Sequence, residues 1–110
     1  MMTREQIMLI FPLKKEWYEK IRSGEKTVEY REVKPYWTRR IQVAAKNCEW
    51  KFLDDKSGRY FIPCVLRLGY TKQQMTAYIT KIEVVNGKDT DLHVDKPVYA
   101  IHLANVREEI

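Results

Sequence analysis

The sequence predicts an α+β domain in which five or six short strands form a barrel-like sheet flanked by one or two helices. Short β-prone runs alternate with two stretches of helical periodicity, which is typical of this class. A length of 110 residues suits a single domain with one core. With 45% hydrophobic residues the chain is too apolar to be disordered, and no repeat or linker divides residues 1–110.

The first two elements are a strand and a helix. Ile7–Phe11 is apolar and β-prone, which predicts a buried strand that ends at Pro12. The pattern then changes to a helical period, and this predicts a helix over 15–23 with Gly24 as its left-handed C-terminal cap. The apolar positions that define this helix are Leu13, Trp17 and Ile21.

A second strand and a second helix follow. Thr27–Arg31 alternates with period two and predicts a strand. Pro35 suits the first turn of a helix, where its missing N–H costs nothing. Apolar residues at helical spacing then predict about three turns. They are Trp37, Ile41, Ala44, Ala45 and Cys48.

Three further strands complete the prediction. Tyr60–Leu68 contains Pro63, so we expect an edge strand or a bulge there. Met75–Val85 is rich in β-branched residues and predicts the next strand. After a polar loop over Asn86–Pro97, a closing strand is expected at Val98–Leu103.

The charge is unevenly distributed. The net charge is +5, yet residues 1–82 hold 17 Lys and Arg against 9 Asp and Glu. No acidic residue occurs between Lys56 and Ile82. A basic body with an acidic tail favours a polyanionic partner such as RNA or DNA, although small domains are also basic without such a partner.

Several classes of protein are not expected. No apolar run reaches the ~18–20 residues that span a bilayer, and the N-terminus lacks the pattern of a signal peptide. We therefore expect no membrane association and a cytoplasmic location with reduced thiols. The spacing of the two cysteines and two histidines fits no zinc template, so neither a metal nor another cofactor is expected. The sequence also shows no third group that would orient a cysteine–histidine pair for nucleophilic catalysis. These residues are Cys48, Cys64, His93 and His102.

The most informative segment is Gly24–Arg31, with the pattern G-x-K-x-x-E-x-R. On a strand Glu29 and Arg31 lie two residues apart and emerge on one face, where an ion pair would hold both side chains. Lys26 at the start of the strand would complete a polar site. The alternative is a solvated strand face whose ion pairs are worth about 0–1 kcal/mol each.

This segment, following a strand and a short helix, resembles the signature of the ASCH domain, a family of the PUA-like superfamily of β-barrels. The similarity extends to Val33–Trp37, to Leu68–Tyr70 and to the last two predicted strands, as in small ASCH proteins of bacteria and phages. The resemblance implies a PUA-like mixed barrel. It also implies a cleft, lined by Lys26, Glu29 and Arg31, that binds RNA or a nucleotide-like ligand.

One branch of very small ASCH proteins hydrolyses N4-acetylcytidine with the motif lysine, a threonine and a glutamate on a downstream helix. This chain has Glu29 at the threonine position, and its Asn86–Pro97 loop shows no helical glutamate. Glu83 lies on a predicted strand, and it could take the role of that glutamate only if the fold brought its carboxylate to the same place in the cleft.

Aromatic and basic residues outside the motif are further candidates for ligand contacts. Aromatic side chains stack on bases and arginines hold phosphates, whereas the alternative roles are packing and a solvated surface. Trp37 lies on the apolar stripe, so we assign it to the core and Tyr36 to stacking. The full set of added candidates is Tyr36, Arg39, Arg40, Arg67 and Tyr70.

The sequence thus favours a module that binds RNA or a nucleotide-like ligand. A second interpretation is a small hydrolase that acts on a modified nucleoside or on RNA. In that enzyme Lys26 is the nucleophile or electrostatic stabiliser and Glu29 the acid–base group. A third is a protein-interaction module whose basic face meets an acidic partner.

Overall fold

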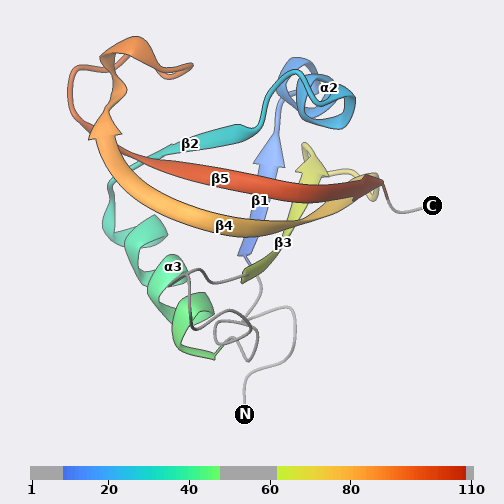
Figure 1. Ribbon diagram of the computed structural model, residues 1–110, viewed down its shortest axis with the longest axis horizontal. Coiled ribbons are helices and arrows are strands. Elements are labelled where there is room, and N and C mark those ends of the chain that lie inside the picture. Colours follow the sequence, from blue (N-terminus) through green and yellow to red (C-terminus); the bar gives the residue numbers. More distant parts are fainter. Residues whose placement is uncertain (1–8, 48–61, 109–110) are drawn as a thin grey trace.

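The computed structural model describes residues 9–47 and 62–108, which form a five-stranded mixed sheet and two α-helices (Figure 1). This confirms the α+β class, while the finer expectation of a PUA-like barrel stays a prediction. In chain order the elements are β1 (Leu9–Leu13), α2 (Lys15–Ser23), β2 (Val28–Glu32), α3 (Pro35–Asn47), β3 (Ile62–Leu68), β4 (Gln74–Asn86), the 3-10 turn η2 (Gly87–Asp89) and β5 (Pro97–Glu108).

The sheet is strongly curled into a half-barrel. Its strand order is β1-β3-β4-β5-β2, so the first two strands of the sequence form its two opposite edges. β1 and β3 are parallel, and all other pairs are antiparallel. The long strands β4 and β5 sweep across the molecule (Figure 1), and register shifts after Thr76 and Ile79 accompany their bend.

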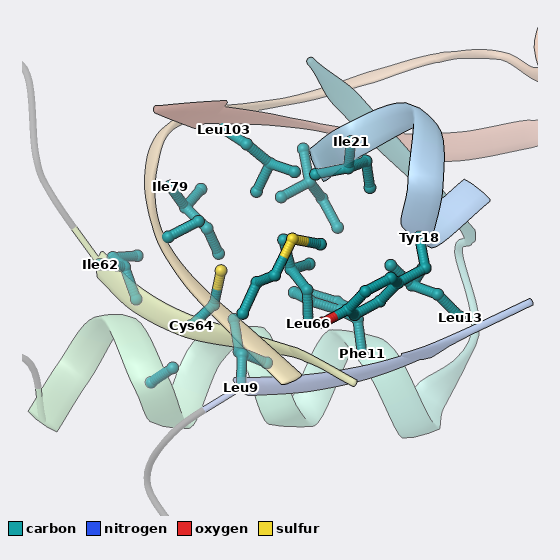
Figure 2. Close-up of a cluster of buried hydrophobic side chains, with 14 residues drawn as sticks. Leu9, Phe11, Leu13, Tyr18, Ile21, Ile62, Cys64, Leu66, Ile79 and Leu103 are labelled. Atoms are coloured by element: carbon teal, nitrogen blue, oxygen red, sulfur yellow. The ribbon is translucent and has the colours of Figure 1, made fainter. Parts of the chain in front are cut away.

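The core lies on the concave side of the sheet (Figure 2). Alternation along β1 buries Leu9, Phe11 and Leu13, as the period of a strand requires. Helix α2 inserts Tyr18 and Ile21, both essentially inaccessible to solvent. Figure 2 shows these side chains converging with residues of β3, β4 and β5, so one core joins helix α2 to four of the five strands.

Helix α2 ends as the sequence predicts. Gly24 has a φ of +85°, the left-handed conformation that glycine adopts without steric cost, and its amide donates to the Ile21 carbonyl at 3.1 Å. The Lys26 amide then donates to the Lys20 carbonyl at 3.0 Å. This cap fixes the direction in which the chain enters β2 and places Lys26 beside the end of the helix.

The expected strand end at Pro12 is wrong, because β1 continues through Leu13. β1 is an edge strand, so only one of its two sides is paired within the sheet. In a strand the N–H and C=O of the same residue point to the same side, and the Pro12 carbonyl therefore shows where its N–H would lie. The Pro12 carbonyl accepts a bond from an Arg31 side chain of the opposite edge at 2.8 Å rather than from β3. The missing N–H therefore faces the open edge, where no ladder partner is required.

The expectation that Pro63 marks an edge strand or a bulge is also wrong. β3 lies between β1 and β4, and its register with β4 shows no shift. Pro63 is the second residue of β3, one position before its described pairing with β1 begins at Cys64. A proline at that position removes no described β1–β3 ladder bond.

The closing strand is twice as long as expected. β5 extends the predicted Val98–Leu103 strand to Pro97–Glu108, and the polar loop before it contains the turn η2. Tyr99 is only partly buried, whereas Ile101 and Leu103 on the same face belong to the core. The predictions for Ile7, Met8, Cys48, Tyr60 and Phe61 lie outside the described residues.

Candidate functional site

A pocket of about 620 Å³ lies where the sheet fails to close, between the edge strands β1 and β2. The start of α2 contributes Trp17 to its wall, the start of α3 contributes Trp37, and the loop before β5 contributes Asp91. Glu29 and Arg31 of β2 also line it. The pocket therefore arises from the open half-barrel, with the two helices and one loop completing its walls.

Glu29 and Arg31 form an ion pair in this pocket. Arg31 donates to Glu29 Oε2 from Nη2 at 2.7 Å and from Nε at 3.2 Å. The Glu29 side chain is 7% exposed and that of Arg31 is 19% exposed. Strand alternation produces this pairing, because residues two apart on β2 share one face. Both charges are thus removed from most of the solvent and compensate each other.

Three further contacts hold the Arg31 guanidinium. Its Nη2 also donates to the Pro12 carbonyl at 2.8 Å, which links the two open edges of the sheet. Its carbon lies 4.9 Å from the Trp37 ring centre and 5.4 Å from that of Phe11, distances at which an aromatic face attracts a cation. Arg31 Nη1 has no hydrogen-bond partner among the described residues, so two oriented N–H groups remain for a ligand.

Lys26 sits beside this pair in an enclosed position. Its side chain is 9% exposed, and its Nζ lies 3.7 Å from Glu29 Oε1 and forms an ion pair with Asp91. The same nitrogen lies 4.9 Å from the Tyr30 ring centre and 5.3 Å from that of Trp17. Two carboxylates and two aromatic faces therefore surround this nitrogen.

Glu29 keeps one accepting position. Its Oε1 accepts the Tyr30 amide at 3.2 Å, while Lys26 Nζ at 3.7 Å is too distant for a hydrogen bond. A carboxylate oxygen can accept two such bonds. The pocket thus offers an acceptor on Glu29 next to donors on Arg31.

The loop that carries Asp91 is closely packed. The Gly87 amide donates to the Lys96 carbonyl at 2.9 Å, and a Cβ on Gly87 would lie 2.7 Å from both the Val94 carbonyl and a methyl group of Val98. Only glycine fits there without a shift of the loop. The Asn86 amide also donates to Asp95 at 2.9 Å. These contacts fix the loop against β5 and bring Asp91 to Lys26.

The charges around the pocket nearly cancel. Four acidic and three basic side chains line it, whereas Lys26 lines a smaller pocket that shares Trp17, Tyr30 and Asp91 with it. At the rim Lys34 pairs with Glu32 at 3.1 Å, and this hydrogen bond lowers the pKa of Glu32. A multiply charged ligand would gain little net attraction inside the pocket, whereas a neutral polar ligand would not disturb these pairs.

Three sequence-predicted residues lie on α3, outside the pocket lining. Tyr36 is 58% exposed and packs edge-on against Trp37, with ring centres 5.0 Å apart. Arg40 lies 4.4 Å from the centre of the Tyr36 ring, and Arg39 is exposed beside it. The assignment of Trp37 to the core is incomplete, because this residue packs on the core and also lines the pocket.

Arg67 and Tyr70 are not brought into the pocket. Arg67 donates to the Gln74 side chain at 3.1 Å across the β3–β4 pair. Tyr70 is 96% exposed at the turn that follows Gly69. The sequence named both as candidates for ligand contacts, but neither is among the residues that line the pocket.

Sequence reasoning missed three parts of the site. Asp91 lies 65 residues from Lys26, and the Pro12 carbonyl carries no side-chain signal. Trp17 belongs to the apolar stripe of α2, yet it forms a pocket wall. The loop holds three aspartates, Asp89, Asp91 and Asp95, and which of them meets Lys26 depends on how the loop folds back.

Neither histidine nor the buried Cys64 is among the residues that line the pocket. His102 Nε2 lies 2.7 Å from Glu83 Oε2, linking β5 to β4, and this contact lowers the pKa of Glu83. Glu83 is not among the residues that line the pocket. Burial raises the pKa of Cys64 to about 12. Within residues 9–47 and 62–108, no three His, Cys, Asp or Glu side chains lie close enough together to hold a metal.

Comparison with family models, with curated proteins and with solved structures finds no match to this chain. In the part of the chain that the structure describes, no helix has the length and apolarity needed to cross a membrane. The resemblance of Gly24–Arg31 to the ASCH motif stays a prediction.

Proposed function

We propose that this domain binds a nucleotide-like ligand or RNA by enclosing one base in the pocket between β1 and β2. The observation that carries the proposal is the Glu29–Arg31 pair, which presents an acceptor and donors side by side between aromatic walls. Bases carry adjacent donors and acceptors on their edges and have flat faces suited to aromatic side chains. The ASCH resemblance, with its expected cleft at the same motif, supports the same interpretation.

Size and charge favour a base over a phosphate group as the occupant. A volume of about 620 Å³ lies within the range of small-molecule sites. For a ligand contact from Lys26 or Arg31 the sequence left two options open, a phosphate or an acceptor on a base edge, and both cations are already engaged by carboxylates. We therefore assign Arg31 to the base edge and Lys26 to holding Glu29 and Asp91 in place.

The test is equilibrium binding of the four ribonucleosides and of short single-stranded RNA to the wild type and to Arg31→Ala. Loss of oriented hydrogen bonds to a base is worth about 1–3 kcal/mol, so we expect an affinity loss of about 5- to 150-fold. Tyr70→Ala is the matched control, because this exposed side chain lies outside the pocket lining.

Thermal unfolding of each variant shows whether the fold is retained, and Glu29→Gln provides a second test because it keeps the shape of the side chain. Unchanged affinity in both folded variants would contradict the proposal. Absence of binding to any nucleoside or RNA would favour the interpretation as a protein-interaction module.

A hydrolase is the second candidate, favoured by the enclosure of Lys26 beside Glu29 and Asp91. In this candidate Lys26 would stabilise negative charge that develops on a substrate carbonyl oxygen. Glu29 Oε1 would accept a proton from the attacking water. Release of cytidine from N4-acetylcytidine by the wild type, with loss in Lys26→Ala and partial retention in Lys26→Arg, is the expected result for this candidate.

A further inference from the structure

We propose that the exposed face formed by Tyr36, Arg39 and Arg40 binds the nucleotide next to the base held in the pocket, so that the ligand is a single-stranded oligonucleotide. This inference rests on the proposed function, since it takes the pocket as the site of the first base. It assigns the phosphates and the second base to α3, and it separates them from the neutral pocket.

The two sites are in direct contact. The Tyr36 ring packs edge-on against Trp37 at 5.0 Å, and Trp37 is a wall of the pocket. Lys34, just before α3, lines the same pocket. An oligonucleotide whose first base lies against Trp37 would thus bring its next base within reach of Tyr36.

Tyr36 is suited to stacking. It is 58% exposed although it is a large aromatic residue at the start of a helix, where burial against the core is available to its neighbour Trp37. Arg40 lies 4.4 Å from its ring centre. This guanidinium holds the ring orientation, which reduces the entropic cost when a base stacks on the ring.

The cations of this face have no acidic partner in the part of the chain that the structure describes. Helix α3 contains no acidic residue, including its first turn, where the helix dipole favours one. Among residues 9–47 and 62–108, Arg39 and Arg40 form no ion pair. This contrasts with the pocket, where Lys26 and Arg31 are both paired. Unpaired arginines beside an exposed aromatic ring match a phosphodiester followed by a base.

The experiment compares one nucleoside, its 5′-monophosphate and a single-stranded RNA tetranucleotide of the same base, each across a salt series. The base chosen is the one that binds best as a nucleoside, or uridine if none binds. A DNA tetranucleotide of the corresponding sequence shows whether the sugar matters. The proteins are the wild type, Tyr36→Ala, Tyr36→Phe and Arg39→Ala/Arg40→Ala.

The tetranucleotide is expected to bind at least about tenfold more tightly than the nucleoside, because stacking on an aromatic ring is worth about 1–3 kcal/mol per base. Tyr36→Ala should reduce tetranucleotide affinity by about 5- to 150-fold, whereas Tyr36→Phe should retain it. The slope of the logarithm of the binding constant against the logarithm of the salt concentration should be shallower in the double arginine variant, by about 0.7 for each phosphate that it no longer binds. Nucleoside affinity should not change in Tyr36→Phe or in the double arginine variant, and in Tyr36→Ala, which removes a ring packed on Trp37, it should fall less than tetranucleotide affinity.

The matched control is Tyr70→Ala/Lys72→Ala, which removes an exposed tyrosine and an exposed lysine from the β3–β4 turn. An equal reduction in this control, or a tetranucleotide that binds no better than the nucleoside, overturns the inference. Nucleoside binding without that increase leaves the proposed pocket function intact. Tetranucleotide binding that depends on Tyr36 without any nucleoside binding supports the α3 face and contradicts the pocket. Binding of neither ligand overturns both.

Discussion

At the scale of single residues, the site depends on one buried carboxylate and the two cations that face it. Glu29 is 6% exposed, and burying its charge costs free energy. Two hydrogen bonds from Arg31 and one from the Tyr30 amide offset this cost. Arg31 in turn is fixed by the Pro12 carbonyl. Each group keeps its orientation because the other is present, so neither can be replaced alone without consequence for stability.

Arg31→Met therefore destabilises the fold. It leaves Glu29 with the Tyr30 amide and a distant Lys26, and we expect a decrease of about 1–3 kcal/mol in the free energy of unfolding, measured by urea denaturation. The double variant Arg31→Met/Glu29→Gln should recover part of this stability, because no unpaired charge remains. A double variant that is no more stable than Arg31→Met would contradict the mutual compensation.

Cys64 gives a second prediction at this scale. Burial, with a smaller effect of Glu29, raises the pKa of its thiol to about 12, so the reactive thiolate is essentially absent at neutral pH. In a Cys48→Ser variant, a thiol reagent should modify Cys64 only after unfolding by denaturant. Rapid modification of the native protein would show that β3 opens at this position.

At the scale of elements, the loop between β4 and β5 positions Asp91 because Gly87 lets it fold tightly. Gly87→Ala places a methyl group 2.7 Å from the Val94 carbonyl and from Val98, so we expect a destabilisation of about 1–3 kcal/mol and weaker nucleoside binding. Gly69→Ala is the control. Its φ of +54° costs about 1 kcal/mol, but no atom lies within 4 Å of the added methyl group, and binding should not change. Unfolding curves and nucleoside titrations measure both effects, and equal binding in the two variants would remove the loop from the site.

Elements set by local patterns could be predicted from the sequence. The apolar spacing of α2 and the glycine that caps it determine that helix, and the two-residue spacing of Glu29 and Arg31 predicts their shared face. Pro12 and Pro63 misled the prediction because their effect depends on which side of the strand is paired. Which side of a strand is paired depends on the order of strands in the sheet, and a short stretch of sequence does not contain that order.

At the scale of the whole molecule, the open half-barrel determines where the site lies. β1 and β2 are neighbours along the chain but form opposite edges, and the bond from Arg31 to the Pro12 carbonyl joins them at the pocket. The contact between Lys26 and Asp91 joins parts of the chain 65 residues apart. Such contacts follow from the order of strands and the path of a loop, which explains why the sequence predicted the motif but not the residues that enclose it.

The most direct test of the central claim, that a base enters the pocket between β1 and β2, is chemical-shift mapping of the 15N-labelled protein during titration with each ribonucleoside. We predict saturable shifts of the Trp17 and Trp37 indole N–H signals and of the amides of Glu29–Arg31 and Asp91. The 69–73 turn should remain unchanged. Shifts confined to that turn or to the exposed face of α3, or none at all, would contradict the account.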